Sequence, residues 1–136
     1  MKIQKQKIVL IEDDVALGNS ILELLLLSNF DVTWFEDSAE ALQYLLQNIP
    51  DLIISDLMMP VMNGEELYLN IRKNRKFTTV PFIIITANID DEVKLRQLEH
   101  GVNDYIMKPF KVKELIFKVN NVLELRKNIE KNFGID

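Results

Sequence analysis

Polar side chains that can carry chemistry follow the short apolar runs of this sequence. Glu12 and Asp13 come directly after one apolar run, and Asp56 comes after another. Thr86 follows a third run, and Lys108 follows a weaker fourth one. Functional side chains of a parallel α/β sheet gather where its strands end, so we expect these residues to lie together. The sequence therefore predicts one site that contains carboxylates, a hydroxyl and an ammonium.

This combination suits a divalent cation and a phosphoryl group. Crowded carboxylates repel one another, and their pKa values rise unless a cation neutralises them. Oxygen ligands without His or Cys suit a hard ion such as Mg²⁺. A carboxylate beside such an ion, a Lys and a hydroxyl can also accept a phosphoryl group, with Asp56 as the nucleophile. Asp14 is more simply explained as the N-cap of the first helix than as part of this site. Asp37 or Ser38 could cap the second helix in the same way.

The elements that must position these residues alternate along the chain. Five short segments rich in apolar or β-branched residues are predicted strands, at 8–11, 32–35, 52–54, 82–85 and 105–107. A helical pattern follows each of them, at 16–27, 39–46, 65–73, 92–100 and 112–128. Strands that are apolar on both faces indicate a parallel sheet, and the alternation indicates an α/β fold with helices on both faces. Trp34 lies on an outer strand, where we expect it to cover the edge of the core.

Length and composition limit the possible classes of protein. The 136 residues suffice for one domain with its own core. The net charge of −5 argues against nucleic-acid binding by this segment, and the absence of Cys excludes disulfides and thiolate metal sites. His100 is the only histidine, which excludes a site built from several. No apolar run is long enough to span a membrane and Met1–Lys7 is too polar for a signal peptide, so we expect a cytoplasmic protein without membrane contact.

Four segments of the sequence resemble bacterial two-component receiver domains, the CheY-like phosphoacceptor modules of response regulators and hybrid sensor kinases. They are Ile8–Asp14, Pro50–Gly64, Pro81–Ala87 and Asn103–Phe110, in the family's order and spacing. The similarity extends from about Lys7 to Leu125. We therefore expect an N-terminal extension at 1–6, a receiver domain at 7–125, and a C-terminal tail or the start of a linker helix at 126–136. The resemblance implies the flavodoxin-like (βα)5 fold, a doubly wound five-stranded parallel sheet of order 2-1-3-4-5.

The resemblance also implies a role for each residue of the site. Asp56 is the phosphoacceptor, Lys108 pairs with the phosphoryl oxygens, and Thr86 donates its hydroxyl to them. Thr86 and Tyr105 form the switch, in which an inward movement of Thr86 vacates space for the Tyr105 ring. The ligands of Mg²⁺, or of Mn²⁺ in its place, are Glu12, Asp13, Asp56 and the backbone carbonyl of Met58. Three further positions have structural roles: a cis bond before Pro109, a left-handed turn at Gly64, and access to the acceptor beside the small Ala87.

The implied function is phosphorylation-dependent switching rather than stand-alone enzymatic turnover. A histidine kinase or a phosphotransfer domain would supply the phosphoryl group to Asp56. The face formed by the fourth helix, fifth strand and fifth helix would then change to control output, and the same face is a possible homodimer interface. Segment 123–133 resembles the tail that joins receivers to AraC-type DNA-binding domains in hybrid sensor kinases. This similarity predicts that the chain is a domain of a larger regulator of transcription.

Three alternatives stay open at this point. The first is a stand-alone single-domain response regulator. The second is a metal-dependent phosphohydrolase with an aspartyl-phosphate intermediate, but haloacid-dehalogenase-like enzymes need a second acid two residues after the nucleophile, and this sequence has Met58 there. The third is a receiver-like binding module that never takes phosphate, which the presence of every site residue disfavours.

Overall fold

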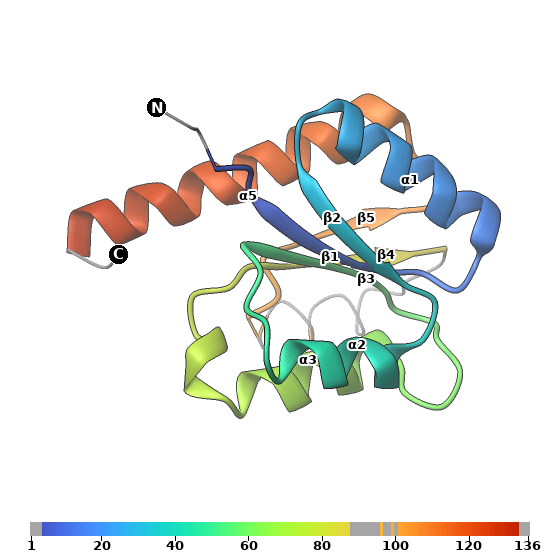
Figure 1. The fold of residues 1–136 in the computed structure, drawn as a ribbon, viewed down its shortest axis with the longest axis horizontal. Coiled ribbons are helices and arrows are strands. Elements are labelled where there is room, and N and C mark those ends of the chain that lie inside the picture. The colour runs from blue at the N-terminus through green and yellow to red at the C-terminus, as the bar shows by residue number, and fades with distance from the viewer. Residues whose placement is uncertain (1–3, 88–95, 97–98, 100, 134–136) are drawn as a thin grey trace.

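The computed structural model describes residues 4–87, 96, 99 and 101–133, and its strands form one parallel sheet. The strands are β1 Lys7–Ile11, β2 Asp31–Phe35, β3 Leu52–Asp56, β4 Phe82–Thr86 and β5 Asp104–Met107. The helices are α1 Val15–Leu27, α2 Ser38–Leu45, α3 Gly64–Arg72 and α5 Val112–Phe133, with a short 3₁₀ helix at Arg75–Phe77. The order across the sheet is β2-β1-β3-β4-β5 (Figure 1), which confirms the predicted topology.

Helices cover both faces of the sheet, with α1 and α5 on one face and α2 and α3 on the other (Figure 1). Alternate residues of β1 supply the two cores. Ile8 and Leu10 pack on the side of α1 and α5, whereas Val9 and Ile11 pack on the side of α2 and α3. β3 and β4 are buried along their whole lengths. A parallel strand that is covered on both faces needs apolar residues at nearly every position, which is why the apolar runs predict these strands.

Side chains at the helix starts accept hydrogen bonds from backbone amides that have no partner within the helix. Asp14 caps α1 by accepting from the Leu17 amide at 3.1 Å, as predicted. Asp37 caps α2, and Asn63 caps α3 in a reciprocal pair with Glu66. Each such cap stabilises its helix by about 1 kcal/mol. The caps therefore fix where the chain turns from a strand end into the next helix.

The boundaries of some elements differ from the predicted ones. Asp56 and Thr86 are the last residues of β3 and β4 rather than the first residues after them, because both still pair with the neighbouring strand. The helix expected at 92–100 lies outside the described residues except for Arg96 and Glu99, which are both helical.

Within the described residues, no helix combines the length and the apolar character that crossing a membrane requires.

Gly64 does not form the left-handed turn that was predicted at this position. It is the first residue of α3, and among the glycines in the described part of the chain only Gly101 has a positive φ, of 95°. A Cβ at position 64 would lie 2.5 Å from the carbonyl oxygen of Asp56, and the Gly64 amide donates to the Leu57 carbonyl at 2.9 Å. Gly64 therefore allows a close approach of α3 to the end of β3. The left-handed residue of this loop is Val61, with φ of 67°.

α5 extends beyond the sheet and is tied to it by Arg126 (Figure 1). The helix is continuous through Phe133, which is longer than predicted, and the domain boundary at 125 stays a prediction. Arg126 Nη1 donates to the Asp51 carbonyl at 2.8 Å, and Arg126 Nε donates to Glu130 Oε1 at 2.9 Å. Because Asp51 directly precedes β3, the guanidinium joins the last helix to the strand that ends at Asp56.

We expect Arg126→Gln to loosen the end of α5. The side chain is only 19% exposed, so loss of its bonds to Asp51 and Glu130 should lower the free energy of unfolding by about 1 kcal/mol. Urea denaturation measures this change, and amide hydrogen exchange should quicken at 127–133. Lys127→Gln, which removes an exposed charge from the same turn, is the control. Equal stabilities of the two variants would contradict the anchoring role of Arg126.

Candidate functional site

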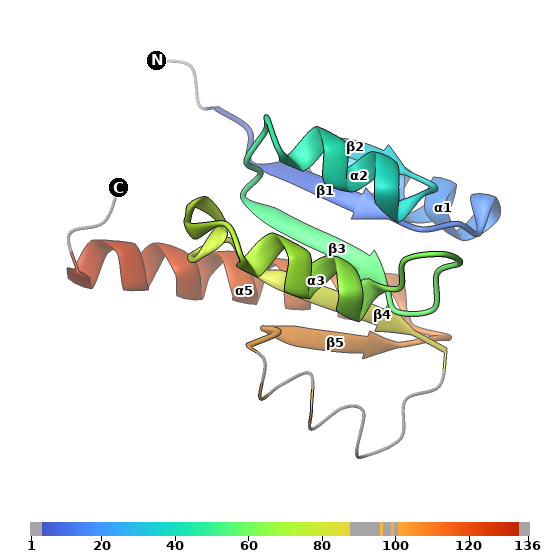
Figure 2. The same cartoon turned by 90° about the horizontal axis from the view of Figure 1, so that it is seen from below.

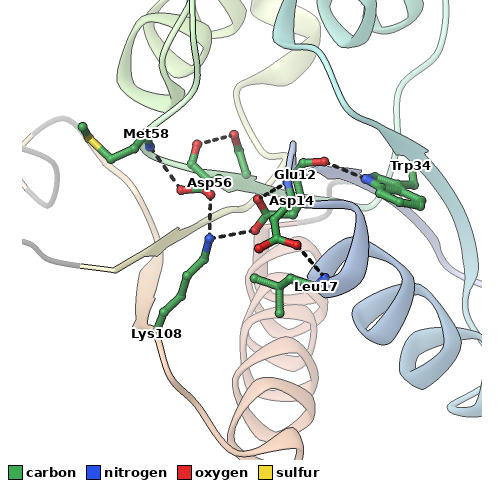
Figure 3. A network of polar contacts seen from close by, with 8 residues as sticks. Glu12, Asp14, Leu17, Trp34, Asp56, Met58 and Lys108 are labelled. Carbon is green, nitrogen blue, oxygen red and sulfur yellow. Dashed lines mark hydrogen bonds and ion pairs between the residues drawn. The ribbon is translucent and has the colours of Figure 1, made fainter.

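The carboxyl ends of the strands bring together side chains that are far apart in the sequence. All strands of the parallel sheet end on the same side (Figure 2). Glu12 follows β1, Asp56 ends β3 and Lys108 follows β5. Lys108 Nζ lies 2.7 Å from Asp56 Oδ2 and 3.0 Å from Glu12 Oε1 (Figure 3). The structure thus brings these three predicted residues into direct contact.

Glu12 is a carboxylate held in the interior. Its side chain is 0% exposed, and its Oε2 accepts from the Asp14 amide at 3.2 Å. Its Oε1 has the ion pair to Lys108 but no hydrogen-bond partner among the described residues. The pKa of Glu12 is raised to about 7, first by burial and next by the contact with Asp56, while Lys108 and the Asp14 amide oppose the rise. A buried carboxylate with so few donors favours a nearby cation.

Lys108 is the ammonium that faces these carboxylates. Burial alone would lower its pKa, but hydrogen bonds and charge interactions with Asp56 and Glu12 raise the pKa of Lys108 above 10.5. The side chain is therefore protonated at neutral pH. Its single positive charge faces the carboxylates of Glu12 and Asp56, and the carboxylate of Asp13 lies in the same group, so this group of side chains carries a surplus of negative charge.

Glu12, Asp13 and Asp56 fit a divalent cation. Each offers one carboxylate oxygen, and these oxygens lie within 4.8 Å of one another. Asp13 is exposed whereas the other two are buried, so the group is accessible to an ion from one side. A donor set made of oxygens alone suits hard ions such as Mg²⁺. The buried Glu12 Oε1, which lacks a hydrogen bond, also fits such an ion, whose identity stays a prediction.

Asp56 is oriented by the backbone as well as by Lys108. Its Oδ1 accepts from the Met58 amide at 3.1 Å, and its Oδ2 accepts from Lys108 Nζ at 2.7 Å. The Asp56 residue is only 4% exposed, whereas Met58 is 70% exposed and its side chain points away from Lys108 (Figure 3). Both carboxylate oxygens of Asp56 are therefore fixed in place. The part of the Met58 carbonyl as a metal ligand stays a prediction.

The remaining predicted residues lie around this group. Thr86 ends β4 with a fully buried side chain, and its carbonyl accepts from the Lys108 amide at 2.7 Å. Ala87 follows and is exposed, while Tyr105 is half-buried on β5. The Lys108–Pro109 peptide bond is cis, in agreement with the resemblance. The switching roles of Thr86 and Tyr105 stay predictions.

Trp34 makes a contact with the site that was not predicted from the sequence. It lies on the edge strand β2, as expected, and is partly buried against the core. Its indole Nε1 also donates to the Glu12 carbonyl at 2.9 Å (Figure 3). The available signal was Gly18, because a glycine inside a helical pattern indicates a close approach. The sequence does not say which side chain makes that approach.

Glu12→Gln should stabilise the metal-free protein at high pH. The folded-state pKa of Glu12 is raised above the ordinary value of 4.5, so the folded state binds this proton more tightly than the unfolded chain does. The resulting stability is complete below about pH 4.5 and is lost as the pH rises through about 7. A glutamine stays neutral throughout. We expect the variant to exceed the wild type by about 3 kcal/mol at pH 8 and by about 1 kcal/mol or less at pH 5.

Urea denaturation in the presence of a chelator, at both pH values, measures this difference. Glu124→Gln is the control, because Glu124 is an exposed carboxylate on α5. A stability difference for Glu12→Gln that is the same at pH 5 and pH 8 would show that the ionised carboxylate of Glu12 is not destabilised by burial.

The chain is similar to known proteins over most of its length. The family model described as response regulator receiver domain matches residues 8–120. Response regulator ArlR of Staphylococcus saprophyticus is 40% identical over 126 residues, which are 93% of this chain and 55% of that protein. Histidine kinase P4 of Formosa agariphila is 35% identical over 131 residues, which are 96% of this chain and 10% of that protein. The chain spans about half or less of the length of the curated relatives it matches.

Solved structures share the fold. The non-phosphorylated HemR receiver domain from Leptospira biflexa has a TM-score of 0.81 and 34% identity, with 88% of this chain and 94% of that chain covered. The chemotaxis response regulator CheY4 of Vibrio cholerae has a TM-score of 0.82 and 25% identity, with coverages of 88% and 99%. The family match includes every strand that carries the site, apart from Lys7 at the start of β1. The chain therefore belongs to the response regulator receiver domain family.

Proposed function

We propose that Asp56 accepts a phosphoryl group from the phosphohistidine of a histidine kinase or a phosphotransfer domain. The observation that carries the proposal is the 2.7 Å contact between Asp56 and Lys108 beside the acidic pair Glu12 and Asp13. A nucleophilic carboxylate, an ammonium and a cation site are the groups that phosphoryl transfer requires. Glu12 and Asp13 would hold Mg²⁺ or Mn²⁺ together with Asp56 and the Met58 carbonyl. Such an ion, when bound, supplies positive charge to offset that of the phosphoryl oxygens.

The transfer exchanges one bond to phosphorus for another. A carboxylate oxygen of Asp56 forms a P–O bond while the P–N bond of the donor breaks, and the bonding electron pair returns to the imidazole nitrogen. The Met58 amide keeps the Asp56 carboxylate in place, and the Lys108 ammonium stabilises negative charge on the oxygens of phosphorus. The chain would catalyse its own phosphorylation and the later hydrolysis, without being a stand-alone enzyme.

The charge of the product would drive the switch. A phosphoryl group adds a charge of about −1.5 to −2 and three acceptor oxygens next to Lys108. Thr86 ends β4 at the same edge of the sheet as Asp56, and we expect its hydroxyl to move toward the new oxygens. The Tyr105 ring on β5 would then take the space that Thr86 leaves. The face formed by β5, α5 and the helix expected at 92–100 would change with it. This change would control output and allow two copies of the chain to pair.

A groove beside Lys108 is the surface on which we expect the donor to dock. It has a volume of about 560 Å³ and lies between α1 and the loop after β5. Leu17 and Leu24 of α1 line it together with Phe110, and all three are only partly buried. Lys108 lines the same groove and contacts Asp56. A helix whose apolar face filled the groove would therefore bring its phosphohistidine next to the acceptor.

The relatives suggest two kinds of parent protein, since ArlR is named a response regulator and P4 a histidine kinase. We propose that this chain is the receiver of such a larger protein, with the stand-alone regulator as the alternative. The resemblance of segment 123–133 to AraC-type linkers favours control of transcription through a DNA-binding domain outside this chain. We place this domain in the cytoplasm, where its donor would be, with no nucleic-acid or membrane contact of its own.

Intact mass tests the proposed phosphorylation. Incubation with acetyl phosphate and Mg²⁺ should add the mass of one phosphoryl group, and a chelator should prevent the gain. Asp56→Asn should abolish it because the nucleophile is lost. Asp37→Asn, which removes a carboxylate from the same edge of the sheet outside the site, should leave it unchanged. No gain in the wild type, or a gain that persists in Asp56→Asn, would overturn the proposal.

A further inference from the structure

The only tryptophan of the chain, Trp34, joins the edge strand of the sheet to the acidic site. Its indole Nε1 donates to the backbone carbonyl of Glu12 at 2.9 Å (Figure 3). The register of the sheet pairs Trp34 with Leu10, so its backbone lies before the end of β1. The side chain thus extends along the sheet edge toward the turn that carries Glu12 and Asp13.

Gly18 of α1 makes room for this arrangement. A Cβ at position 18 would overlap the six-membered ring of Trp34. Glycine inside a helix is unfavourable, because it loses more backbone freedom on folding than other residues. Gly18 is buried in the second turn of α1, where the helix pattern alone would favour a larger side chain. The close packing of the indole on α1 explains why position 18 is a glycine.

Two adjacent residues of β2 hold the backbone of Glu12 from both sides. The Glu12 amide donates to the Phe35 carbonyl at 3.0 Å, and the Glu12 carbonyl accepts from the Trp34 indole. The carbonyl of Glu12 belongs to the same planar peptide unit as the amide of Asp13. A hydrogen bond to that carbonyl therefore restrains the orientation of the peptide plane, and with it the position of the Asp13 Cα that carries the side chain.

We propose that Trp34 is a positioning residue for the divalent-cation site. The indole N–H orients the Glu12–Asp13 peptide, so that the carboxylates of both residues are held in place before the ion arrives. Trp34 does not touch the ion; it acts through the backbone of Glu12. This inference rests on the proposed function, because the cation is the one that we assign to Glu12, Asp13 and Asp56.

Trp34→Phe removes the N–H and keeps an aromatic side chain at this position of β2. We expect the variant to bind Mg²⁺ about fivefold more weakly in isothermal titration calorimetry, which is the usual worth of one hydrogen bond. Val32→Ala is the control, since Val32 packs against the same core from the same strand without contacting Glu12. The control should lose stability but keep the wild-type affinity. Equal affinities of Trp34→Phe and the wild type, or equal losses in Trp34→Phe and Val32→Ala, would overturn the proposal.

Gly18→Ala is a second test, in which helix propensity and the packing of the indole have opposite effects. Alanine favours a helix over glycine, so the variant should form α1 at least as readily on propensity alone. Its methyl group displaces the indole, however, and we expect the Mg²⁺ affinity to fall by about as much as in Trp34→Phe. An unchanged affinity for Mg²⁺ in folded Gly18→Ala would show that the packing of the indole on α1 does not matter to the site.

A measurement without metal separates this proposal from the proposed function. The Asp14 amide donates to Glu12 Oε2, and the Glu12 amide donates to Phe35. In a chelator, Trp34→Phe should quicken hydrogen exchange at both amides by about fivefold, and Val32→Ala should not. If the wild type binds no Mg²⁺ but this difference appears, the metal assignment fails, whereas the hold of Trp34 on the Glu12–Asp13 backbone stands. Unchanged exchange at both amides overturns the positioning role.

Discussion

The electrostatics of the acidic site in this receiver domain depend on one ammonium group that two carboxylates share. Lys108 contacts Asp56 at 2.7 Å and Glu12 at 3.0 Å, and Glu12 has no exposed surface through which water could disperse its charge. The pKa of Glu12, raised to about 7 mainly by burial, expresses the same shortage of positive charge. Such a site gains from a divalent cation and responds strongly to a further negative group. In our proposal, cation binding and phosphorylation therefore depend on one electrostatic arrangement.

The sheet creates this arrangement, because the three residues lie at the carboxyl ends of three different strands. Parallel pairing of β1 with β3 brings Glu12 beside Asp56, and β4 lies between β3 and β5, which leads to Lys108. The elements around the sheet refine the position of each group. Gly64 allows α3 to start against the Asp56 carbonyl, and the Trp34 indole holds the carbonyl of Glu12. The edge strand β2 thereby contributes to the site without supplying a charged group.

The parallel α/β class could be predicted from the residues because strands buried on both faces appear as apolar runs, and the acidic residues that follow them mark the functional edge. The order of the strands was predicted only through the resemblance to receiver domains. The cap at Asp14 was also predictable, since it depends on local hydrogen bonding. The reason for Gly64 and the contact of Trp34 were not, because each depends on atoms brought close by tertiary packing. The helix expected at 112–128 continues to Phe133 as α5, and the contact by which Arg126 ties it to the backbone before β3 also depends on tertiary packing.

The most direct test identifies the carboxylate that carries the phosphoryl group. Borohydride reduces an acyl phosphate to an alcohol, and peptide mass spectrometry then locates the reduced residue. We predict reduction at Asp56 alone, since this carboxylate is the one that both Lys108 and the Met58 amide hold. Reduction at Glu12 or Asp13 instead, or no reduced residue in protein that has gained a phosphoryl group, would contradict the central claim.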